Sequence, residues 1–581
     1  MAENDKFKLA RTTAVNAVQA LGRGFDVTCD IRLLYCKGSP GSRLLKVDEE
    51  TLEDLVLADD VRVPRVSSDI KKKPEIPSRY SLGVLDFDQM SELFNKKLGI
   101  SGKTPLGMFN AMFSFSGCVQ ADKSQTKSLA VDGWNIPLYS VYLKPPFILS
   151  EEVKKAVPST WEPAALASFI EKYGTHIILS VEVGGKDVIY VKQHESSNLT
   201  KAEMELHLNK LFESRFKGIE SSMFTSENKH KEQLMFTNPK VRSQPFSTDV
   251  TSSLTGKEDI TVIYRRRGGN DLVQDHMQWK DTVNESPDVL SMTLLPTSSL
   301  LDPGPGYENL SRAIDAYLNF KPPLEELQYF LEFQVPRAWA PVVNPVGPRK
   351  EPVCPALQFS LMGPKILICT DQVSVGRKPV TGLRLCLEGA KVNRLAVHVQ
   401  HLTTLPKILQ PHWDSYIPIG APKWHGPEEQ DSRWFEPVLW KNFSHVSTAP
   451  IEYNETWFGD ASGAFIVTGA QLGVWDFGLK SVLHLKLLYS KVPGCTIRRS
   501  VWDHTPGPSE QQQSKAKKVV SNSNPITVAT QATQKLMKFV DTSEVMRGPE
   551  HLPGHWLVTG AKLCVEKSKI FLRVKYSLLN Y

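Results

Sequence analysis

The stretch YGTHIILSVEVGG, residues 173–185, decides how the first half of the chain folds. From Ile177 onward its apolar side chains occupy every second position, which is the pattern of a β-strand with one buried face. Two adjacent glycines, Gly184 and Gly185, interrupt this strand, and the next residues, KDVIYVKQH, resume it. The glycine pair therefore predicts either a turn between two strands or a sharp bend where another segment packs close to the backbone.

The segments around this strand also show clear patterns. A helix is predicted directly before it, at about residues 160–173, because apolar residues recur there at helical spacing. Gly174 follows this helix and can take the left-handed conformation that ends many helices. A second glycine pair, Gly268 and Gly269, ends another strand pattern in ITVIYRRRGGN.

Two segments upstream have different periods. Residues 86–100 carry apolar side chains at helical spacing, which predicts a helix. Residues 107–120, GMFNAMFSFSGCVQ, alternate instead and predict a strand.

A proline-rich segment divides the chain. Residues 335–356 contain six prolines, which predicts a stiff, extended linker. Helix and strand patterns mix before this segment, and strand patterns predominate after it. The expected organisation is a mixed domain over 10–335, a linker over 336–356 and an all-β domain over 357–581.

The all-β domain repeats itself. The tripeptide VTG begins a pair of strand patterns at positions 380, 467 and 558. Such repeats predict three similar hairpins around a pseudo-threefold axis, each burying one face against the others.

Composition excludes several classes of function. The net charge of +6 on 581 residues is too small to indicate a nucleic-acid partner. Eight cysteines without a CxxC pair predict neither a metal site nor a disulfide framework, and they fit the reduced thiols of the cytosol. The N-terminal residues lack an apolar signal segment, and no stretch is apolar enough for a transmembrane helix, so we expect neither.

No catalytic centre is expected. The sequence offers no GxSxG elbow to partner His176, so we expect a hydrogen-bonded core histidine at this position. The GKTP at 102–105 lacks the frame of a phosphate-binding loop. We therefore expect no enzyme activity, no cofactor, no metal and no small-molecule substrate.

The opening stretch resembles the signature of the membrane attack complex/perforin (MACPF) family, Y-G-T-H-aromatic-x6-G-G, with Ile177 in place of the usual aromatic residue. The residues that match this signature are Tyr173, Gly174, Thr175, His176, Gly184 and Gly185. Two later segments, RRRGGNDLVQDHMQWKDTV and AIDAYLNFKPPLEELQYFLEFQVPRAWAP, resemble the plant branch named for constitutively activated cell death and necrotic spotted lesions. The resemblance extends from about residue 10 to the C-terminus.

This resemblance implies an α+β fold. It implies a MACPF domain with a bent, twisted, four-stranded antiparallel sheet flanked by helical clusters, and a β-prism-like C-terminal domain. Both glycine pairs would lie near the bend. In relatives that kill cells, the two helical clusters unfold into β-hairpins, and neighbouring copies close a transmembrane barrel.

The plant branch implies a biological role as well. That role is negative regulation of programmed cell death, the hypersensitive response, and of salicylic-acid-linked immunity in plant defence. The implied location is the cytosol, with peripheral association to the plasma membrane. The implied partners are a membrane lipid surface and further copies of the same chain.

Residues 202–216 satisfy a helical and a strand period at once. Thr200 and Glu203 form a capping box, which favours a helix. The alternating residues that would face lipid in a hairpin are Ala202, Met204, Leu206, Leu208, Phe212 and Phe216, on a face that Lys210 and Ser214 interrupt. The expected return strand is less suitable because Pro239 and Pro245 lie in its path.

Two mechanisms remain open at this point. In the first, copies oligomerise on a membrane and the clusters at about 86–132 and 198–258 insert as hairpins. In the second, the protein is a non-inserting scaffold that binds a partner or lipid. The basic runs at 71–73 and 265–267 are either solvated surface or sites for anionic headgroups. The tryptophans within 413–457 either pack in a core or anchor the chain at a membrane interface.

Overall fold

The computed structural model describes residues 7–580 except 59–60, 217–240, 245–258, 342–353, 364, 390, 408, 411–421, 453–462, 479, 504–535 and 547–554. The chain forms two compact units, Met1–Gln328 and Tyr329–Tyr581. We describe each unit by itself.

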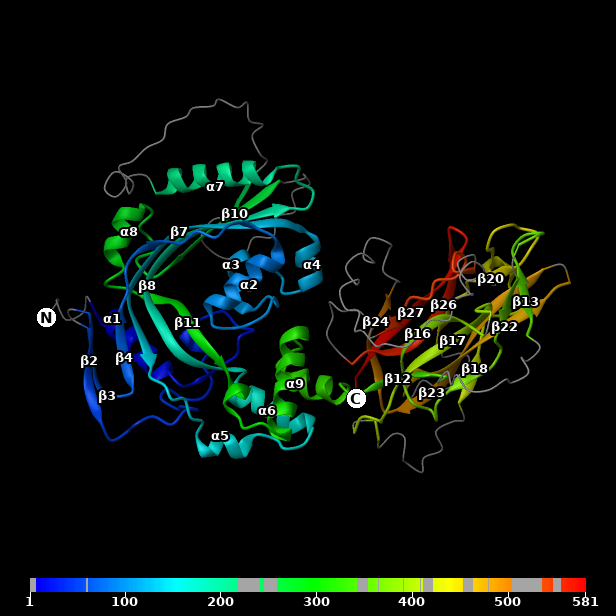
Figure 1. Ribbon diagram of the computed structural model, residues 1–581, viewed down its shortest axis with the longest axis horizontal. Helices are drawn as coiled ribbons and strands as arrows, with labels where there is room; N and C mark the ends of the chain where they lie inside the picture. Colours follow the sequence, from blue (N-terminus) through cyan, green and yellow to red (C-terminus); the bar gives the residue numbers. More distant parts are fainter. Residues whose placement is uncertain are drawn as a thin grey trace. The chain divides into compact units, whose positions relative to one another are not determined.

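One sheet organises the first unit (Figure 1). Within the described residues it has nine strands: β1 Gly24–Phe25, β4 Ile70–Pro74, β5 Ser78–Arg79, β6 Gly83–Leu85, β7 Thr126–Leu143, β8 His176–His194, β9 Val241–Gln244, β10 Ile260–Arg267 and β11 Asp288–Pro296. Four longer strands, β7, β8, β10 and β11, form its frame, and β8 pairs antiparallel with each of the other three. A separate hairpin consists of β2 Leu52–Ala58 and β3 Val61–Ser67.

Strand β8 bends at its glycine pair and does not turn back. β8 runs through 19 residues, and β7 pairs with it on both sides of the glycines. On the opposite edge, β8 changes partner: Gly184 pairs with Asp288 of β11, and Lys186 pairs with Arg267 of β10. The glycine pair therefore forms a bend and not a turn between two strands. The curve of β7 and β8 is visible in Figure 1.

Helices cover both faces of the sheet and its lower end. The helices of this unit, with the one at the boundary between the units, are α1 Lys8–Ala20, α2 Phe87–Lys97, α3 Gly107–Phe113, α4 Val119–Ser124, α5 Glu151–Ala156, α6 Pro163–Tyr173, α7 Lys201–Arg215, α8 His276–Thr282, α9 Pro305–Phe320 and α10 Leu327–Glu332. α7 packs on Ile189 and Val191 of β8, whereas Phe113 of α3 contacts Tyr190. Because neighbouring strand residues point to opposite faces, α7 and α3 lie on opposite sides of the sheet, as Figure 1 shows.

The predicted strand at 107–120 is wrong, because this segment forms α3 and α4. Phe109 and Phe113 are four residues apart and share one helix face. Both rings are fully buried in a cluster with Phe94 and Phe115, at centroid separations of 5.3–5.8 Å. The segment resembled a strand because its cluster residues, Phe109, Phe113 and Phe115, all fall on alternate positions of the sequence.

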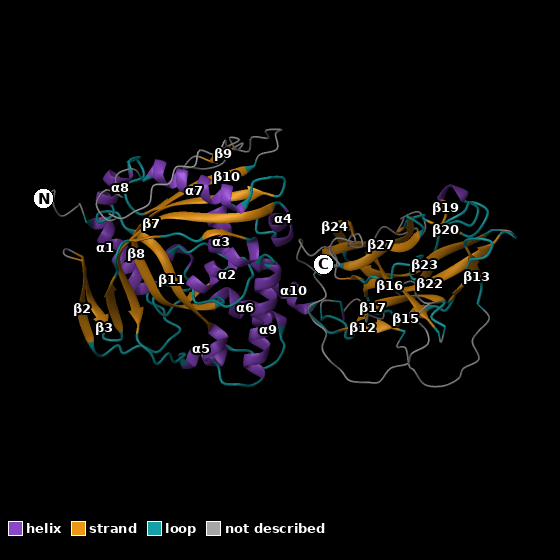
Figure 2. Ribbon diagram, turned by 45° about the horizontal axis from the view of Figure 1, so that its top comes forward, coloured by secondary structure: helices purple, strands orange, loops and turns teal. Residues whose placement is uncertain are grey.

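The second unit is built from strands (Figure 2). Its main hairpins are β16 Val380–Glu388 with β17 Arg394–Leu402, β22 Gly463–Asp476 with β23 Ser481–Pro493, and β26 Leu557–Glu566 with β27 Lys569–Asn580. Each hairpin belongs to a different sheet, and the three sheets bury side chains in one shared core. The shorter strands are β12 Arg337–Ala340, β13 Ala356–Gln358, β14 Lys365–Ile368, β15 Val373–Ser374, β18 Lys423–His425, β19 Phe435–Pro437, β20 His445–Ser447, β21 Ile451–Glu452, β24 Thr496–Asp503 and β25 Val545–Met546.

The VTG repeat has a structural reason. In each hairpin the threonine of VTG is an extra residue that shifts the pairing register, which is a β-bulge. These threonines, Thr381, Thr468 and Thr559, are buried. The hydroxyl of Thr468 lies 2.8 Å from Ser490 Oγ, and that of Thr559 lies 2.5 Å from Ser577 Oγ. The bulge and its buried hydroxyl contact therefore recur in the repeat.

Part of the predicted linker is a strand of the second unit. Arg337–Ala340 forms β12, which pairs antiparallel with β17. Residues 342–353 of the predicted linker lie outside the described residues.

Candidate functional site

The signature residues join helix α6 to the sheet. α6 ends at Tyr173, and the amide of Gly174 donates to Ile170 O at 2.8 Å. Gly174 has φ +76° with an extended ψ of −171°, so it has a positive φ but not the left-handed helical conformation that we expected. A Cβ at this position would lie 2.7 Å from Phe25 O. Only glycine fits both requirements.

His176 is a core residue. It is 2% exposed, and its Nδ1 lies 3.0 Å from Thr175 Oγ1. Thr175 in turn contacts β1, because its hydroxyl donates to Phe25 O. Burial lowers the pKa of His176 to about 4, so the imidazole is neutral at physiological pH. These contacts give the histidine a positioning role in the fold.

The two glycine pairs lie against each other at the bend. A Cβ on Gly268 would lie 2.3 Å from Gly184 O, and a Cβ on Gly184 would lie 2.3 Å from Ile136 O. Trp279 of α8 fills the space next to them: its indole is fully buried and Nε1 donates to Gly268 O at 3.0 Å. A side chain on Gly269 would come within 2.3 Å of that indole nitrogen. The bend is therefore a close-packed junction of β8, β10 and α8.

A buried carboxylate lies directly after this bend. Asp187 is fully buried and accepts from Arg215 at 2.7 Å, Arg266 at 2.9 Å and His276 at 3.0 Å. Burial opposes its ionisation, but the hydrogen bond from His276 and the charges of Arg215 and Arg266 outweigh burial and hold the pKa of Asp187 below its ordinary value. Arg215 is the last residue of α7. The network therefore fastens the end of α7 to β8, β10 and α8.

The predicted hairpin face divides into two groups in the helix. The capping box of Thr200 and Glu203 is present, as expected. Four of the six residues form a helical stripe that is buried against the sheet: Met204, Leu208, Phe212 and Phe216. Ala202 and Leu206 are exposed, with Leu206 at 36%. Arg79 adds a charge contact, since its guanidinium lies 3.9 Å from the Phe212 ring centroid while it pairs with the buried Asp132.

Lysines lie beside the bend on the face that α2 covers. The ammonium groups of Lys97, in α2, and of Lys186, in β8, lie 3.5 and 3.7 Å from the ring centroid of Tyr80. Lys186 is 7% exposed. Burial and the charge of Lys97 lower the pKa of Lys186 to about 7, and burial lowers the pKa of Lys97 to about 8.

The arginine run at 265–267 is not the solvated face that was one of its two expected interpretations. Arg266 pairs with Asp187, and Arg267 pairs with Asp30 at 2.6 Å. Arg265 donates to Ala111 O at 3.2 Å and to Ser114 Oγ at 2.6 Å, at the end of α3. All three therefore serve internal contacts. The lysine run differs, since Lys73 is exposed and pairs with Glu75.

Most of the expected return strand lies outside the described residues, including Pro239 and Pro245. Within it, β9 Val241–Gln244 runs parallel to β10.

Apolar side chains are exposed at one end of the second unit. We call this group the apolar tip: Leu361, Met362, Trp434, Leu439, Trp440 and Phe477, which are 39–94% exposed. Their loops are connected, because Gln358 N donates to Ser444 Oγ and the Phe435 ring lies 6.0 Å from that of Phe477. Figure 2 places β13, β19 and β20 close together. Of the tryptophans in 413–457, Trp434 and Trp440 are thus exposed, and Trp413 and Trp457 lie outside the described residues.

One group of metal-ligating side chains occurs in the described part of the chain: Cys386, Glu388 and His398. Arg384 donates to His398 Nδ1, so His398 Nε2 carries the proton and donates to Glu388 Oε1 at 2.5 Å. A metal at this histidine would need the nitrogen that the proton occupies. Hydrogen bonds and the ion pair of Arg394 with Glu388 therefore account for this group. All eight cysteines are free thiols.

None of the helices in the described ranges is long and apolar enough to cross a membrane.

Comparisons with known proteins identify the family of the chain. The MAC/Perforin domain family matches residues 11–327. The chain is 57% identical to MACPF domain-containing protein CAD1 of Arabidopsis thaliana, over 98% of this chain and 97% of the relative. It is 45% identical to MACPF domain-containing protein At4g24290 of the same plant, over 98% and 97%. The crystal structure of GNIP1Aa from Chromobacterium piscinae matches 84% of this chain and 86% of its own, with 12% identity and a TM-score of 0.35. The chain belongs to the MACPF family.

Proposed function

We propose that this protein restrains programmed cell death and salicylic-acid-linked defence in plants, and that it acts at the cytosolic surface of the plasma membrane. Its 57% identity to CAD1, over nearly the whole of both chains, supports the role in cell death. The apolar tip supports the membrane as the site of action. Exposed tryptophans partition to the membrane interface, and the neighbouring Lys441 and Lys480 would each gain about 1 kcal/mol near an anionic leaflet.

The proposed mechanism is oligomerisation followed by insertion of α7 and of the α2–α3 cluster as hairpins. The observation that carries it is the sequence of α7. The residues Met204, Leu208, Phe212 and Phe216 are buried in the helical state, and in a strand they would share a face with the exposed Ala202 and Leu206. A membrane would bury all six, so lipid offsets the cost of detaching the helix from the sheet, about 1.5–3 kcal/mol for each large apolar side chain.

A non-inserting scaffold is the second candidate. The observation that favours it is the buried network around Asp187. Removal of α7 would separate Arg215 from a carboxylate that stays buried, and breaking a buried pair costs about 3–5 kcal/mol. In this case the protein would bind lipid through the apolar tip and keep its helices folded.

A disulfide staple separates the two candidates. Cysteines placed in α7 and β6, which contact each other, would lock the helix on the sheet where their Cα atoms lie about 4.4–6.8 Å apart. The measurement is dye leakage from liposomes containing anionic lipid. Insertion predicts leakage that oxidation of the staple abolishes and reductant restores, while unstapled protein leaks under both conditions. Binding without leakage, in any redox state, supports the scaffold.

Membrane association has its own test. Met362→Ser with Trp440→Ser should reduce co-sedimentation with anionic liposomes at least tenfold. Leu9→Ser with Leu272→Ser removes two exposed leucines of the first unit and is the matched control. Equal binding of both double variants would contradict the role of the apolar tip.

A further inference from the structure

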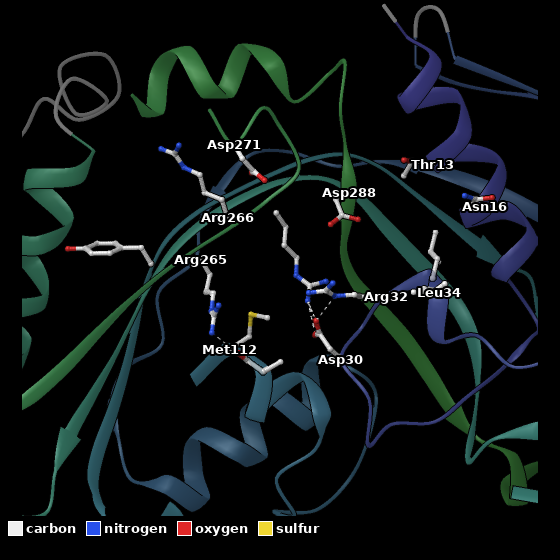
Figure 3. A pocket seen from close by; sticks show the side chains of 14 residues that line it. Thr13, Asn16, Asp30, Arg32, Leu34, Met112, Arg265, Arg266, Asp271 and Asp288 are labelled. Carbon is white, nitrogen blue, oxygen red and sulfur yellow. Dashed lines mark hydrogen bonds and ion pairs between the residues drawn. The ribbon is translucent and has the colours of Figure 1, made fainter. Parts of the chain in front are cut away.

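A cavity of about 590 Å³ lies in the first unit. Its walls come from α1, the loop that leads into the 3-10 helix Leu33–Tyr35, α3, the end of β10 and the start of β11 (Figure 3). Its volume is in the range of small-molecule sites, about 300–1,000 Å³. Ligand binding in this cavity is argued from six of its charged lining residues: Asp30, Arg32, Arg265, Arg267, Asp271 and Asp288.

Two of the three guanidinium groups on this side of the cavity share one carboxylate. Arg267 Nη2 lies 2.7 and 2.6 Å from the two oxygens of Asp30, and Arg32 Nε lies 3.1 Å from Asp30 Oδ2. Arg265 donates to Ala111 O and Ser114 Oγ, and it has no carboxylate partner among the described residues. Its buried Nε has no hydrogen-bond partner within that part of the chain. This side of the cavity therefore carries more guanidinium groups than carboxylates.

The opposite side carries acceptors. Asp271 and Asp288 are exposed carboxylates, and Figure 3 shows them across the cavity from Met112 and Asp30. A ligand that bridges the cavity would thus meet guanidinium donors at one end and carboxylate acceptors at the other. A simple anion satisfies one end alone.

We propose that this cavity binds a small phosphate ester that carries hydroxyl or ammonium groups at its other end. The phosphate oxygens accept from Arg265 and Arg32, because guanidinium groups bind phosphate through paired, charge-assisted hydrogen bonds. The hydroxyl or ammonium groups donate to Asp271 and Asp288. Ethanolamine phosphate is a soluble monoester with these groups, and phosphatidylethanolamine carries the same phosphate and ammonium groups in a phosphodiester headgroup. The site belongs to the folded protein and does not require hairpin insertion, which would remove its α3 wall.

A ligand bound in this cavity should stabilise the end of α3. Arg265 already contacts the last turn of α3, so a phosphate bound to its guanidinium fixes the side chain that holds this helix to β10. We expect slower hydrogen exchange at the amides of Ser114 and Phe115, which donate to Ala111 O and Asn110 O. Exchange in α7 stays unchanged.

The test uses the full-length chain and isothermal titration calorimetry. Ethanolamine phosphate and glycerol 3-phosphate should bind, inorganic phosphate should bind at least tenfold more weakly, and ethanolamine should not bind. Arg265→Gln and Arg32→Gln should each weaken binding at least tenfold. Asp271→Asn should weaken ethanolamine phosphate but leave inorganic phosphate unchanged. Arg62→Gln is the matched control, because Arg62 and Arg32 are both 64% exposed and each pairs with a nearby aspartate.

Absence of binding by both esters at millimolar concentration overturns the proposal, as does an equal loss in the Arg62 variant. Should Arg265→Gln not fold, the exposed Arg32 decides the outcome. Vesicle flotation identifies the source of the phosphate. An Arg32-dependent preference for phosphatidylethanolamine over phosphatidylcholine vesicles points to a lipid headgroup. Calorimetric binding without that preference points to a soluble ester.

Discussion

The helices on the two faces of the bent sheet are held by different forces. On one face, α7 packs an apolar stripe and adds buried charge contacts through Asp187 and through Arg79. On the other face, α2 and α3 pack a cluster of phenylalanines, and their charge contacts are those of Lys97 and Arg265. The attachment of α7 thus depends strongly on ion pairing, and that of α2–α3 mainly on apolar packing.

This difference implies that the two clusters respond to different conditions. A change in charge at the sheet weakens α7 first, because its terminal Arg215 relies on a carboxylate that cannot be reached by water. The phenylalanine cluster responds instead to the loss of apolar volume. If both clusters insert, they are released by separate steps.

The largest expected effect follows from removing the centre of the charged network. Asp187→Ala leaves Arg266 and Arg215 without their shared carboxylate in a buried position, which should lower the free energy of unfolding by about 3–5 kcal/mol. Urea unfolding measures this loss, and hydrogen exchange should show faster opening of α7 than of α3.

The control for this variant is Asp54→Ala, which breaks the exposed pair with Arg62 and should cost less than about 1 kcal/mol. A loss below that value for Asp187→Ala, or unchanged exchange in α7, would show that the network does not hold this helix.

A smaller loss is expected on the opposite face. Phe109→Ala creates a cavity among the phenylalanine rings and should cost about 3 kcal/mol. Exchange should rise in α2 and α3 and stay constant in α7. Faster exchange in both clusters would contradict the idea that they are held independently.

The pH dependence of stability should differ between the faces. The pKa of Lys186 is about 7 in the fold and near its ordinary value of about 10.5 when unfolded. Between these values the unfolded chain holds the extra proton, so stability rises with pH by about 1.4 kcal/mol per unit. Lys186→Met should reduce this rise, which unfolding curves from pH 7 to 10 would detect, and Lys97, whose pKa is about 8, should account for part of the rise that remains.

Low pH should weaken the attachment of α7. The folded pKa of Asp187 is lowered, so its contribution is fully present above the ordinary pKa of about 4 and is lost as the pH falls below it. Opening of α7 should therefore increase below about pH 4 in the wild type and show no such increase in Asp187→Ala. A parallel increase in both proteins would assign the acid sensitivity to other groups.

The smallest effect on stability is expected at the outer surface of α7. Leu206→Asp changes a residue that is 36% exposed and should alter the free energy of unfolding by less than about 1 kcal/mol. In a hairpin the same carboxylate would face lipid, so dye leakage should be abolished. Asn209→Asp introduces the same charge on the other strand face and should leave leakage intact.

Sequence patterns predicted those features that depend on neighbouring residues. The capping box of α7, the glycine pairs and the VTG hairpins are local, and each has the role that its residue types require. The strand predicted at 107–120 was wrong because residues four apart, such as Phe109 and Phe113, share a face in a helix as well as in a strand, and Phe115 joins the same cluster from beyond the end of α3. Periodicity cannot distinguish these cases without the neighbours of Phe109 and Phe113.

The Asp187 network was not predicted, because its partners Arg215, Arg266 and His276 are distant in sequence and meet through the strand pairing of β8 with β10. Trp279 was missed for the same reason. Trp279 lies in the segment RRRGGNDLVQDHMQWKDTV, which resembles the plant branch. Its position shortly after a glycine pair was the signal that could have indicated a packing role. Placing its indole on Gly268 and Gly269 required the fold.

The central claim is that residues 202–216 are a helix in the free protein and a strand with one lipid-facing side in a membrane. The most direct measurement is a scan with an environment-sensitive fluorophore on single cysteines from Ala202 to Phe216, with the half-exposed native cysteines replaced by serine. The account predicts that liposomes increase emission at alternate positions, including Leu206 but not Asn209. A helical period that persists in the presence of liposomes, or no change at any position, would contradict it.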